Sequence, residues 1–386
     1  MLLDVMASLR DVLPAGSSMH LILLADGPLR AAAEALGVHV QVVPMPPALA
    51  ATGSNASMLR LLARGLIGLP SLWSFTKQLR AIVRSIQPDI IHSNGLKTHL
   101  LTRFIASAAP SAVCVWHVHD LLGERPMVGR VLRRFAGRTS CAIAISQAVA
   151  ADLRDVLPRV RVATVLNAID LDHFSPGPAD AAVLDRLASL QPADESVVRI
   201  GLVATYARWK GHDVFLQAAA AARKARPDLP MRFYIVGGPI YSKAGSQFDR
   251  DELVARAKQL GIIEHVGFVD FQPDPLPVYR ALDIVVHAST RPEPFGRTIA
   301  EAMACGRVVI VSQAGGAGEL FQPEVDAVGV PPGDVAALSE SIIRLARYPS
   351  VRRQFGAAAR LRAAERFDRR RLGPAIYEVY RTCKRS

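Results

Sequence analysis

The chain has 386 residues, of which 50% are hydrophobic, so it is long enough for two domains with buried cores. It contains no apolar run of about 18 residues or more, and we expect neither a transmembrane helix nor a signal peptide. The formal net charge of +12 favours an anionic partner. No nucleic-acid-recognition motif accompanies this charge, so nucleic acid is not an expected partner.

Predicted strands and helices alternate in two successive runs, which indicates parallel sheets with helices on both faces. After a helix at 2–12, the first run has strands at 19–25, 39–43, 89–92, 112–118, 141–145 and 162–166 and helices at 28–36, 72–85, 97–108 and 128–137. The second run has strands at 197–204, 231–236, 284–287 and 308–311 and helices at 213–225, 251–260 and 297–305. We therefore expect an N-terminal domain at 1–171, a linker rich in Asp, Pro and Ala at 172–195, and a C-terminal domain at 196–370.

The most informative stretch of the chain contains two carboxylates, Glu293 and Glu301. A buried-strand pattern at 283–288 precedes them, and a helix is predicted at 297–305. A helix N-terminus offers free N–H groups and a positive dipole end that suit a phosphate, and Gly296 would allow its close approach. Because Glu293 and Glu301 lie beside this helix end and can bind sugar hydroxyls, the stretch predicts a nucleotide-sugar site. The alternative is one exposed glutamate on a loop and another on a helix face.

Several motifs carry a family resemblance. Glu293-Pro-Phe-Gly, Glu301-Ala-Met-Ala-Cys-Gly and Gly315-Gly-Ala-Gly-Glu resemble the signature of the retaining glycosyltransferases of family 4. Lys210-Gly and Val236-Gly-Gly are similar to further elements of that family. The resemblance implies the GT-B fold, an α/β architecture in which two Rossmann-like domains with parallel sheets face each other across a cleft. In that arrangement a last helix, at 371–386, is expected to cross back to the N-terminal domain.

The resemblance also implies an activity. It implies transfer of a sugar from a nucleotide diphosphate sugar to an acceptor hydroxyl, with retention of configuration and with neither a metal ion nor another cofactor. The expected acceptor is a glycan or a lipid-linked hydroxyl, as in cell-surface glycan or glycolipid synthesis. The chain is expected to be cytoplasmic, or peripheral on the inner face of the cell membrane. Its cysteines show no paired spacing, which agrees with a reducing compartment.

Residue roles follow from the matching motifs. Lys210 and Arg208 are expected to hold the phosphates as charge grows on the leaving group. Glu301 is expected to bind ribose and Glu293 the transferred sugar, while His119 would line the reacting centre. The expected catalytic residues are His119, Glu293 and Lys210. The expected donor-binding residues are Arg208, Lys210, Gly237, Glu293, Pro294, Phe295, Gly296, Glu301, Gly315 and Gly316.

Two departures from the family pattern keep another function open. Thr205 stands where an arginine is usual, and no first strand and Gly-rich loop precede the helix expected at 2–12. A misassigned start codon, a shortened chain and a true loss would each explain the second departure. A non-catalytic nucleotide-sugar-binding subunit therefore remains the alternative. A Rossmann dehydrogenase is excluded, because no Gly-x-Gly-x-x-Gly motif opens a helix after a strand.

Three other patterns have a structural and a functional interpretation. His117 and His119 share a strand face, but no further metal ligand is marked near them, so a metal site is not expected. Asp249-Arg-Asp251 has the form of a metal-binding motif but opens a predicted helix, where aspartate caps. The basic stretches 77–84 and 130–138 either lie on an anionic membrane surface or form the charged outer face of core-packed helices.

Overall fold

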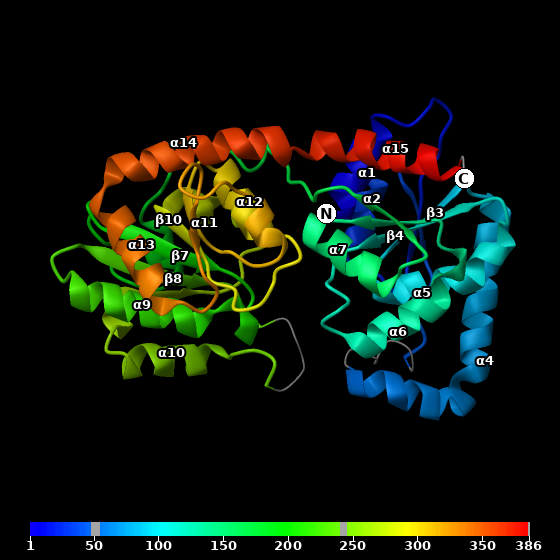
Figure 1. Cartoon of the computed structure of the whole chain (residues 1–386), viewed down its shortest axis with the longest axis horizontal. Coiled ribbons are helices and arrows are strands. Elements are labelled where there is room, and N and C mark those ends of the chain that lie inside the picture. The colour runs from blue at the N-terminus through cyan, green and yellow to red at the C-terminus, as the bar shows by residue number, and fades with distance from the viewer. Residues whose placement is uncertain (48–54, 240–244, 385–386) are drawn as a thin grey trace. The chain divides into compact units, whose positions relative to one another are not determined.

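The computed structural model describes residues 1–47, 55–239 and 245–384 of the chain. These residues form two compact units, which we describe separately (Figure 1). The first unit comprises residues 1–167 and 369–386, and the second comprises residues 168–368. Both are α/β folds with parallel strands, as the alternating sequence pattern predicts. None of the described helices combines the length and the apolar character that crossing a bilayer requires.

The first unit contains two separate parallel sheets. Strands β3, β4, β5 and β6 pair in that order, and β1 pairs with β2 alone. Every residue of β4 and β5 is buried, so both of their faces are covered, whereas β1 is only partly buried. In these strand orders, β1 and β3 each lie at the end of a sheet, so within the described part of the chain each has one edge without a strand partner. The absence of the family's first strand stays a prediction. The bounds are β1 His20–Leu23, β2 His39–Val42, β3 Ile90–Asn94, β4 Val113–Val118, β5 Cys141–Ala144 and β6 Arg161–Thr164.

Helices surround these two sheets. Helix α15 packs along α1 (Figure 1), and a Cβ atom added to Gly373 would lie 2.1 Å from the carbonyl oxygen of Ser8. Helix α4 is much longer than predicted because it continues through Gly65, Gly68 and Pro70, residues that normally interrupt a helix. The bounds are α1 Leu2–Arg10, α2 Pro28–Glu34, α4 Asn55–Ile86, α5 Leu96–Ile105, α6 Pro126–Phe135, α7 Gln147–Val156 and α15 Leu372–Lys384.

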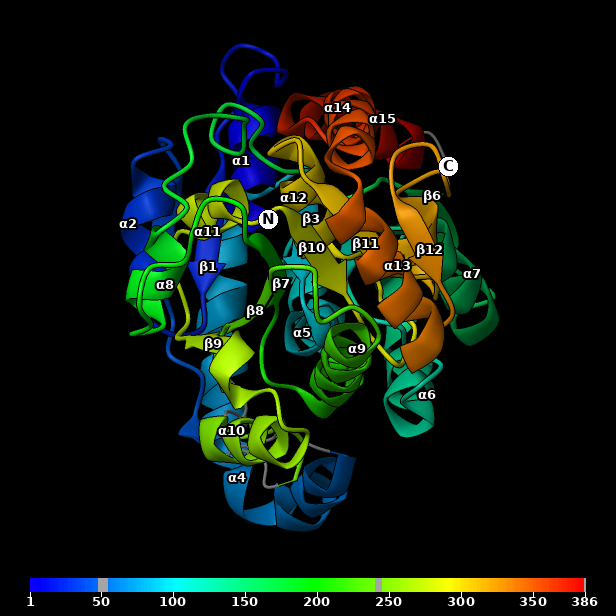
Figure 2. The same ribbon diagram turned by 90° about the vertical axis from the view of Figure 1, so that its left-hand side faces the viewer.

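The second unit is built on one parallel sheet with the strand order β12-β11-β10-β7-β8-β9. Figure 1 shows α12 and α14 on one side of this sheet and α9 and α10 on the other, and Figure 2 shows it from the side. Buried apolar residues such as Ile200, Phe215 and Phe233 form its core. The strands are β7 Val198–Val203, β8 Met231–Val236, β9 Val266–Val269, β10 Ile284–His287, β11 Val308–Ser312 and β12 Val328–Val330. The helices are α8 Val183–Leu187, α9 His212–Ala225, α10 Arg250–Gln259, α11 Leu276–Ala281, α12 Arg297–Ala304, α13 Val335–Arg347 and α14 Pro349–Arg366.

The strand order of the second unit creates a topological switch point. From β7 the chain proceeds outward to β8 and β9, and from β10 it proceeds in the other direction to β11 and β12. Strands β7 and β10 pair directly, so their following loops leave the same sheet edge side by side. The crevice outside the carboxyl ends of strands at such a point is where open α/β sheets bind ligands.

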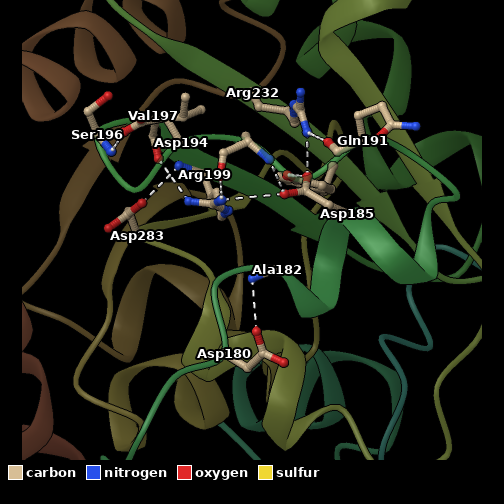
Figure 3. Close-up of polar contacts among 12 residues, drawn as sticks. Asp180, Ala182, Asp185, Gln191, Asp194, Ser196, Val197, Arg199, Arg232 and Asp283 are labelled. Atoms are coloured by element: carbon tan, nitrogen blue, oxygen red, sulfur yellow. Dashed lines mark hydrogen bonds and ion pairs between the residues drawn. The ribbon is translucent and has the colours of Figure 1, made fainter.

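At the opposite ends of β7 and β8, a buried carboxylate attaches helix α8 to the sheet. Asp185 is fully buried and accepts hydrogen bonds from Arg232 Nη1 at 2.6 Å, Tyr234 Oη at 2.5 Å and the backbone N–H of Ala193 at 2.9 Å. Figure 3 shows Asp185 between Arg232 and the buried Arg199, whose Nη2 lies 3.4 Å from the carboxylate. Part of the segment expected as a linker, 172–195, is thus packed into the second unit.

Candidate active site

Three loops of the second unit meet at the switch point. They follow β7, β10 and β11, and they carry Lys210, Glu293 and Gly315 respectively. A backbone bridge joins the last two loops, because the N–H of Gly316 donates to the carbonyl oxygen of Glu293 at 2.7 Å. The loops after β7 and β10 are also joined, through Thr290 N–H and the carbonyl oxygen of Trp209 at 2.8 Å. The fold therefore brings together three motifs that are separated in the sequence, those of Lys210, Glu293 and Gly315.

Lys210 and Glu293 form an ion pair at this sheet edge. The ammonium Nζ of Lys210 lies 2.8 Å from both carboxylate oxygens of Glu293. The indole of Trp209 lies beneath the same ammonium, with 4.2 Å between Nζ and the ring centroid. The side chains are 20% and 10% exposed, so solvent screens the pair only weakly. Two residues predicted to bind different parts of a donor are thus in direct contact with each other.

His287 and Ser289 complete the surroundings of Glu293. The hydroxyl of Ser289 donates to Glu293 Oε2 at 3.0 Å, and His287 Nε2 lies 3.2 Å from the same oxygen. Burial alone would raise the pKa of Glu293, but the hydrogen bond from His287 and the charge of Lys210 outweigh it and lower the pKa to about 2. Glu293 is therefore ionised at neutral pH although it is almost fully buried. His287 and Ser289 were not predicted as site residues.

Glu301 lies in the second turn of α12, where the motif predicts it. Its carboxylate is buried, and its Oε2 accepts a hydrogen bond from Tyr279 Oη at 2.9 Å. Arg297, four residues earlier on the same helix, donates through Nε to Glu301 Oε1 at 3.0 Å. Burial raises the pKa of Glu301, against the opposing charge of Arg297. The sequence did not predict that Tyr279 and Arg297 contact Glu301.

The loop between these glutamates leads into the N-terminus of α12. Phe295 is buried and packs edge-on against Phe367, with 5.9 Å between ring centroids, which anchors the loop beside Pro294. Gly296 is the N-cap of α12 with φ of 105°, and it provides no side chain to cap the first turn. The first turn of α12 therefore has no side-chain cap on its backbone N–H groups, and anion binding at this turn stays a prediction.

Two glycines allow close backbone contacts around this loop. Gly315 has φ of 61°, and a Cβ atom there would lie 2.7 Å from the carbonyl oxygen of Glu293. Gly237 follows β8 with φ of 149°, and a Cβ atom there would lie 1.9 Å from the carbonyl oxygen of Ala204 at the end of β7. Any larger residue would push these loops apart, so both motifs preserve the geometry of the sheet edge.

Arg208 takes a different position from its neighbour Lys210. Its Nη2 donates to Glu252 on α10 at 2.6 Å, and its guanidinium lies 4.2 Å from the centroid of the Phe248 ring. Arg208 is thus held toward α10, while Lys210 is held by Glu293. Asp249 caps the same helix, because its side chain accepts from the N–H of Glu252 at 2.7 Å. This confirms the capping role predicted for Asp249.

His119 lies in the first unit, just beyond the end of β4. Its Nε2 donates a hydrogen bond to the amide oxygen of Asn94 at the end of β3, which leaves Nδ1 as the acceptor. Burial lowers the pKa of His119 to about 4, so its ring is neutral at pH 7. The buried ring of His117 lies beside it, with centroids 4.4 Å apart. In the described residues, no group of three or more His, Cys, Asp or Glu side chains is arranged to hold a metal ion.

Two family models match this chain. The model described as Glycosyltransferase Family 4 matches residues 20–173, and the model described as Glycosyl transferases group 1 matches residues 191–362. The second match contains Lys210, Glu293 and Glu301. The D-inositol 3-phosphate glycosyltransferase of Rhodococcus erythropolis is 35% identical over 200 residues, which cover 51% of this chain and 42% of that protein. The chain thus spans less than half the length of this curated relative.

Solved structures match over nearly the whole chain. The crystal structure of Anabaena HepE in complex with UDP and glucose has a TM-score of 0.79 and 25% sequence identity, and the match covers 99% of this chain and 95% of that one. Its complex with UDP-glucose has the same TM-score and identity, with coverage of 99% and 94%. Together with the two family models, these matches agree with the motifs and with the α/β units described above. The chain therefore belongs to glycosyltransferase family 4 and has the GT-B fold.

Proposed function

We propose that this protein is a retaining glycosyltransferase that moves a sugar from a nucleotide diphosphate sugar to an acceptor hydroxyl. The observation that carries the proposal is the cluster of Lys210, Glu293 and Glu301 at the switch point of the second unit. It combines a cation, two buried carboxylates and an uncapped helix N-terminus, which are complementary to a diphosphate flanked by two sugars. Anabaena HepE binds UDP and UDP-glucose, which makes uridine nucleotides the first donors to test.

The proposed reaction uses positioning and electrostatics. The bond between the anomeric carbon and the diphosphate oxygen breaks, the acceptor oxygen bonds to that carbon on the same face, and the departing diphosphate takes the acceptor proton. Lys210 and the N-terminus of α12 stabilise the charge that grows on the leaving group. Glu301 accepts hydrogen bonds from the ribose and Glu293 from the transferred sugar. Neither a metal ion nor a protein nucleophile takes part in this scheme.

The proposal extends to His119 and to the acceptor. The free Nδ1 of His119, set by the hydrogen bond to Asn94, is an acceptor for a hydroxyl of the reacting sugar. The proposed acceptor is a glycan or a lipid-linked hydroxyl in the synthesis of cell-surface glycan or glycolipid. The proposed location is cytoplasmic or at the inner face of the cell membrane.

The test is turnover with a panel of nucleotide sugars and lipid-linked acceptors. Release of nucleoside diphosphate is measured for the wild type and for Glu293→Gln, and the anomeric configuration of the product is read by NMR. Glu340→Gln is the matched control, because Glu340 is an exposed glutamate on α13 of the same unit. An inverted product would refute retention. Equal activity of wild type and Glu293→Gln would refute the role of Glu293.

The alternative is a non-catalytic subunit that binds nucleotide sugars. One observation favours it: Arg208 pairs with Glu252, and Thr205 replaces the usual arginine, so fewer cations than usual are held toward the diphosphate. A donor that binds with measurable affinity but is not turned over with any acceptor would support this alternative. Binding together with release of nucleoside diphosphate would reject it.

A further inference from the structure

Three neighbouring helices of the first unit carry only positive charge. Helices α4, α5 and α6 contain five, two and three lysines or arginines respectively, and none of them contains an aspartate or glutamate. The whole chain has 46 basic and 34 acidic residues, so a segregation this complete is unusual for solvated helix faces. Helix α5 packs against both α4 and α6.

Three basic residues in the C-terminal half of α4 lie on one stripe of the helix together with Trp73. Trp73, Lys77, Arg80 and Arg84 follow one another at spacings of four, three and four residues, which places them on one face. Lys77 Nζ lies 5.1 Å from the centroid of the Trp73 ring, which agrees with this stripe. The opposite face holds buried apolar residues, for example Leu79, that pack into the core of the unit.

Helices α5 and α6 extend this stripe into a continuous surface. Arg80 donates to the carbonyl oxygen of Phe104 on α5 at 3.4 Å, and the Phe104 ring lies 5.7 Å from that of Phe135 on α6. On α6, Met127 and Arg130 are exposed one turn apart. We call the surface that these side chains form the basic face. Its residues are Trp73, Lys77, Arg80 and Arg84 on α4, Arg103 and Phe104 on α5, and Met127, Arg130 and Arg134 on α6.

Each helix contributes a large apolar side chain to the basic face. Trp73 is 66% exposed, Phe104 41% and Met127 40%, and basic residues flank each of them. Exposing such side chains to water is unfavourable unless a partner covers them. The face is formed by the outer sides of helices, whereas non-specific binding of single-stranded nucleic acid uses a charged groove lined with stacking aromatic rings. Cations beside interfacial aromatic and apolar residues are typical of helices that lie on anionic bilayers.

We propose that the basic face docks this protein on an anionic lipid bilayer, with Trp73, Phe104 and Met127 inserted among the headgroups. The proposal is independent of catalysis, because the face belongs to the first unit and Lys210, Glu293 and Glu301 belong to the second. Basic side chains supply the attraction and the three apolar side chains supply the insertion.

The test is co-sedimentation of the full chain with vesicles. Phosphatidylcholine vesicles with and without phosphatidylglycerol are compared for the wild type and for the triple variant Arg84→Ala, Arg103→Ala, Arg134→Ala. These arginines are exposed and form no ion pair with any residue that the structure describes, so their loss should leave the fold intact. Each basic side chain contributes about 1 kcal/mol near such a surface, so the partition coefficient should fall about 100-fold.

Matched controls lie in the second unit. The triple variant Lys224→Ala, Lys258→Ala, Arg353→Ala removes the same charge from exposed positions elsewhere and should bind as the wild type does. Trp73→Ala should weaken binding, whereas Phe271→Ala, at a residue 61% exposed in the second unit, should not.

The outcomes separate the proposal from its competitors. Equal weakening by both triple variants would show that net charge alone attracts the protein, and would overturn the proposal. Binding to single-stranded nucleic acid but not to anionic vesicles would also overturn it. Binding to anionic vesicles that is lost with the first triple variant and with Trp73→Ala would support it, even if no sugar transfer is found.

Discussion

The substitution Glu293→Gln tests whether the ion pair at the switch point sets the charge of the site. Glu293 is buried, and it contacts Lys210, His287 and Ser289. Its pKa of about 2, against an ordinary value of 4.5, means that the fold favours the ionised carboxylate. At about 1.4 kcal/mol per pKa unit, the difference corresponds to about 3 kcal/mol of folding free energy.

The sign of the pH dependence follows from the lowered pKa. A carboxylate whose pKa is depressed by folding stabilises the protein above its unfolded pKa, and this contribution is lost as pH falls from about 4.5 toward 2. Glutamine cannot ionise, so it lacks this contribution at every pH. We expect Glu293→Gln to be about 3 kcal/mol less stable than the wild type near neutral pH, with a difference that shrinks below pH 4.5.

The assay is urea denaturation of both proteins at several pH values between 3.5 and 7. Tryptophan fluorescence reports the local transition, because Trp209 stacks beneath Lys210 and is the one tryptophan of the sequence between 168 and 368. Glu340→Gln provides the baseline for losing an exposed glutamate on a helix of the same unit. A difference that is the same at pH 3.5 as at pH 7, or one below about 1 kcal/mol at pH 7, would refute the reasoning.

The other predictions address donor binding, catalysis and stability. Glu301→Ala should weaken nucleotide-sugar binding by about 1–3 kcal/mol in calorimetry, since ribose loses a buried acceptor; unchanged affinity in a folded variant would contradict this role. Lys210→Ala should cost about 2–4 kcal/mol in kcat/KM, and wild-type turnover should survive a chelator; activity lost to the chelator and restored by manganese would instead indicate a metal. Asp185→Ala should destabilise the second unit by about 3–5 kcal/mol in thermal or urea unfolding, because it leaves Arg199 buried without its carboxylate, and a loss below about 1 kcal/mol would show that other acceptors suffice.

Local sequence patterns predicted the parts of the fold that local forces determine. The run 283–288 predicted β10, and the helix expected at 297–305 matches α12, with Gly306 in the left-handed conformation of a C-terminal cap. The short strands β9 and β12 were missed, because each is a short apolar run interrupted by a glycine, Gly267 in β9 and Gly329 in β12. The glycine motif after β11 forms only a single 3-10 turn, at Gly316–Glu319.

The candidate site shows the same division between local and non-local information. Glu293 and Glu301 belong to one continuous motif and could be predicted from it. Tyr279 contacts Glu301 from 22 residues away, on a helix whose sequence carries no mark of that contact. His287 and Ser289 lie at the end of a buried strand, where the apolar run made them look like ordinary core residues. The available signal was their spacing: His287 and Ser289 are two residues apart, which places them on one strand face, six and four residues before Glu293.

The contact between Lys210 and Glu293 suggests how the site would distinguish a donor from a spent nucleotide in the proposed reaction. Before a donor binds, each charge satisfies the other, with Nζ 2.8 Å from both carboxylate oxygens. A diphosphate that attracts Lys210 takes this cation from Glu293. The carboxylate then keeps only Ser289 and His287 as partners, and burying a carboxylate that has lost its counter-charge is costly. The hydroxyls of an attached sugar can replace the lost hydrogen bonds, whereas a nucleoside diphosphate carries no such sugar. The intact donor should therefore compensate both charges, while the product compensates only Lys210, which favours product release once the sugar has been transferred.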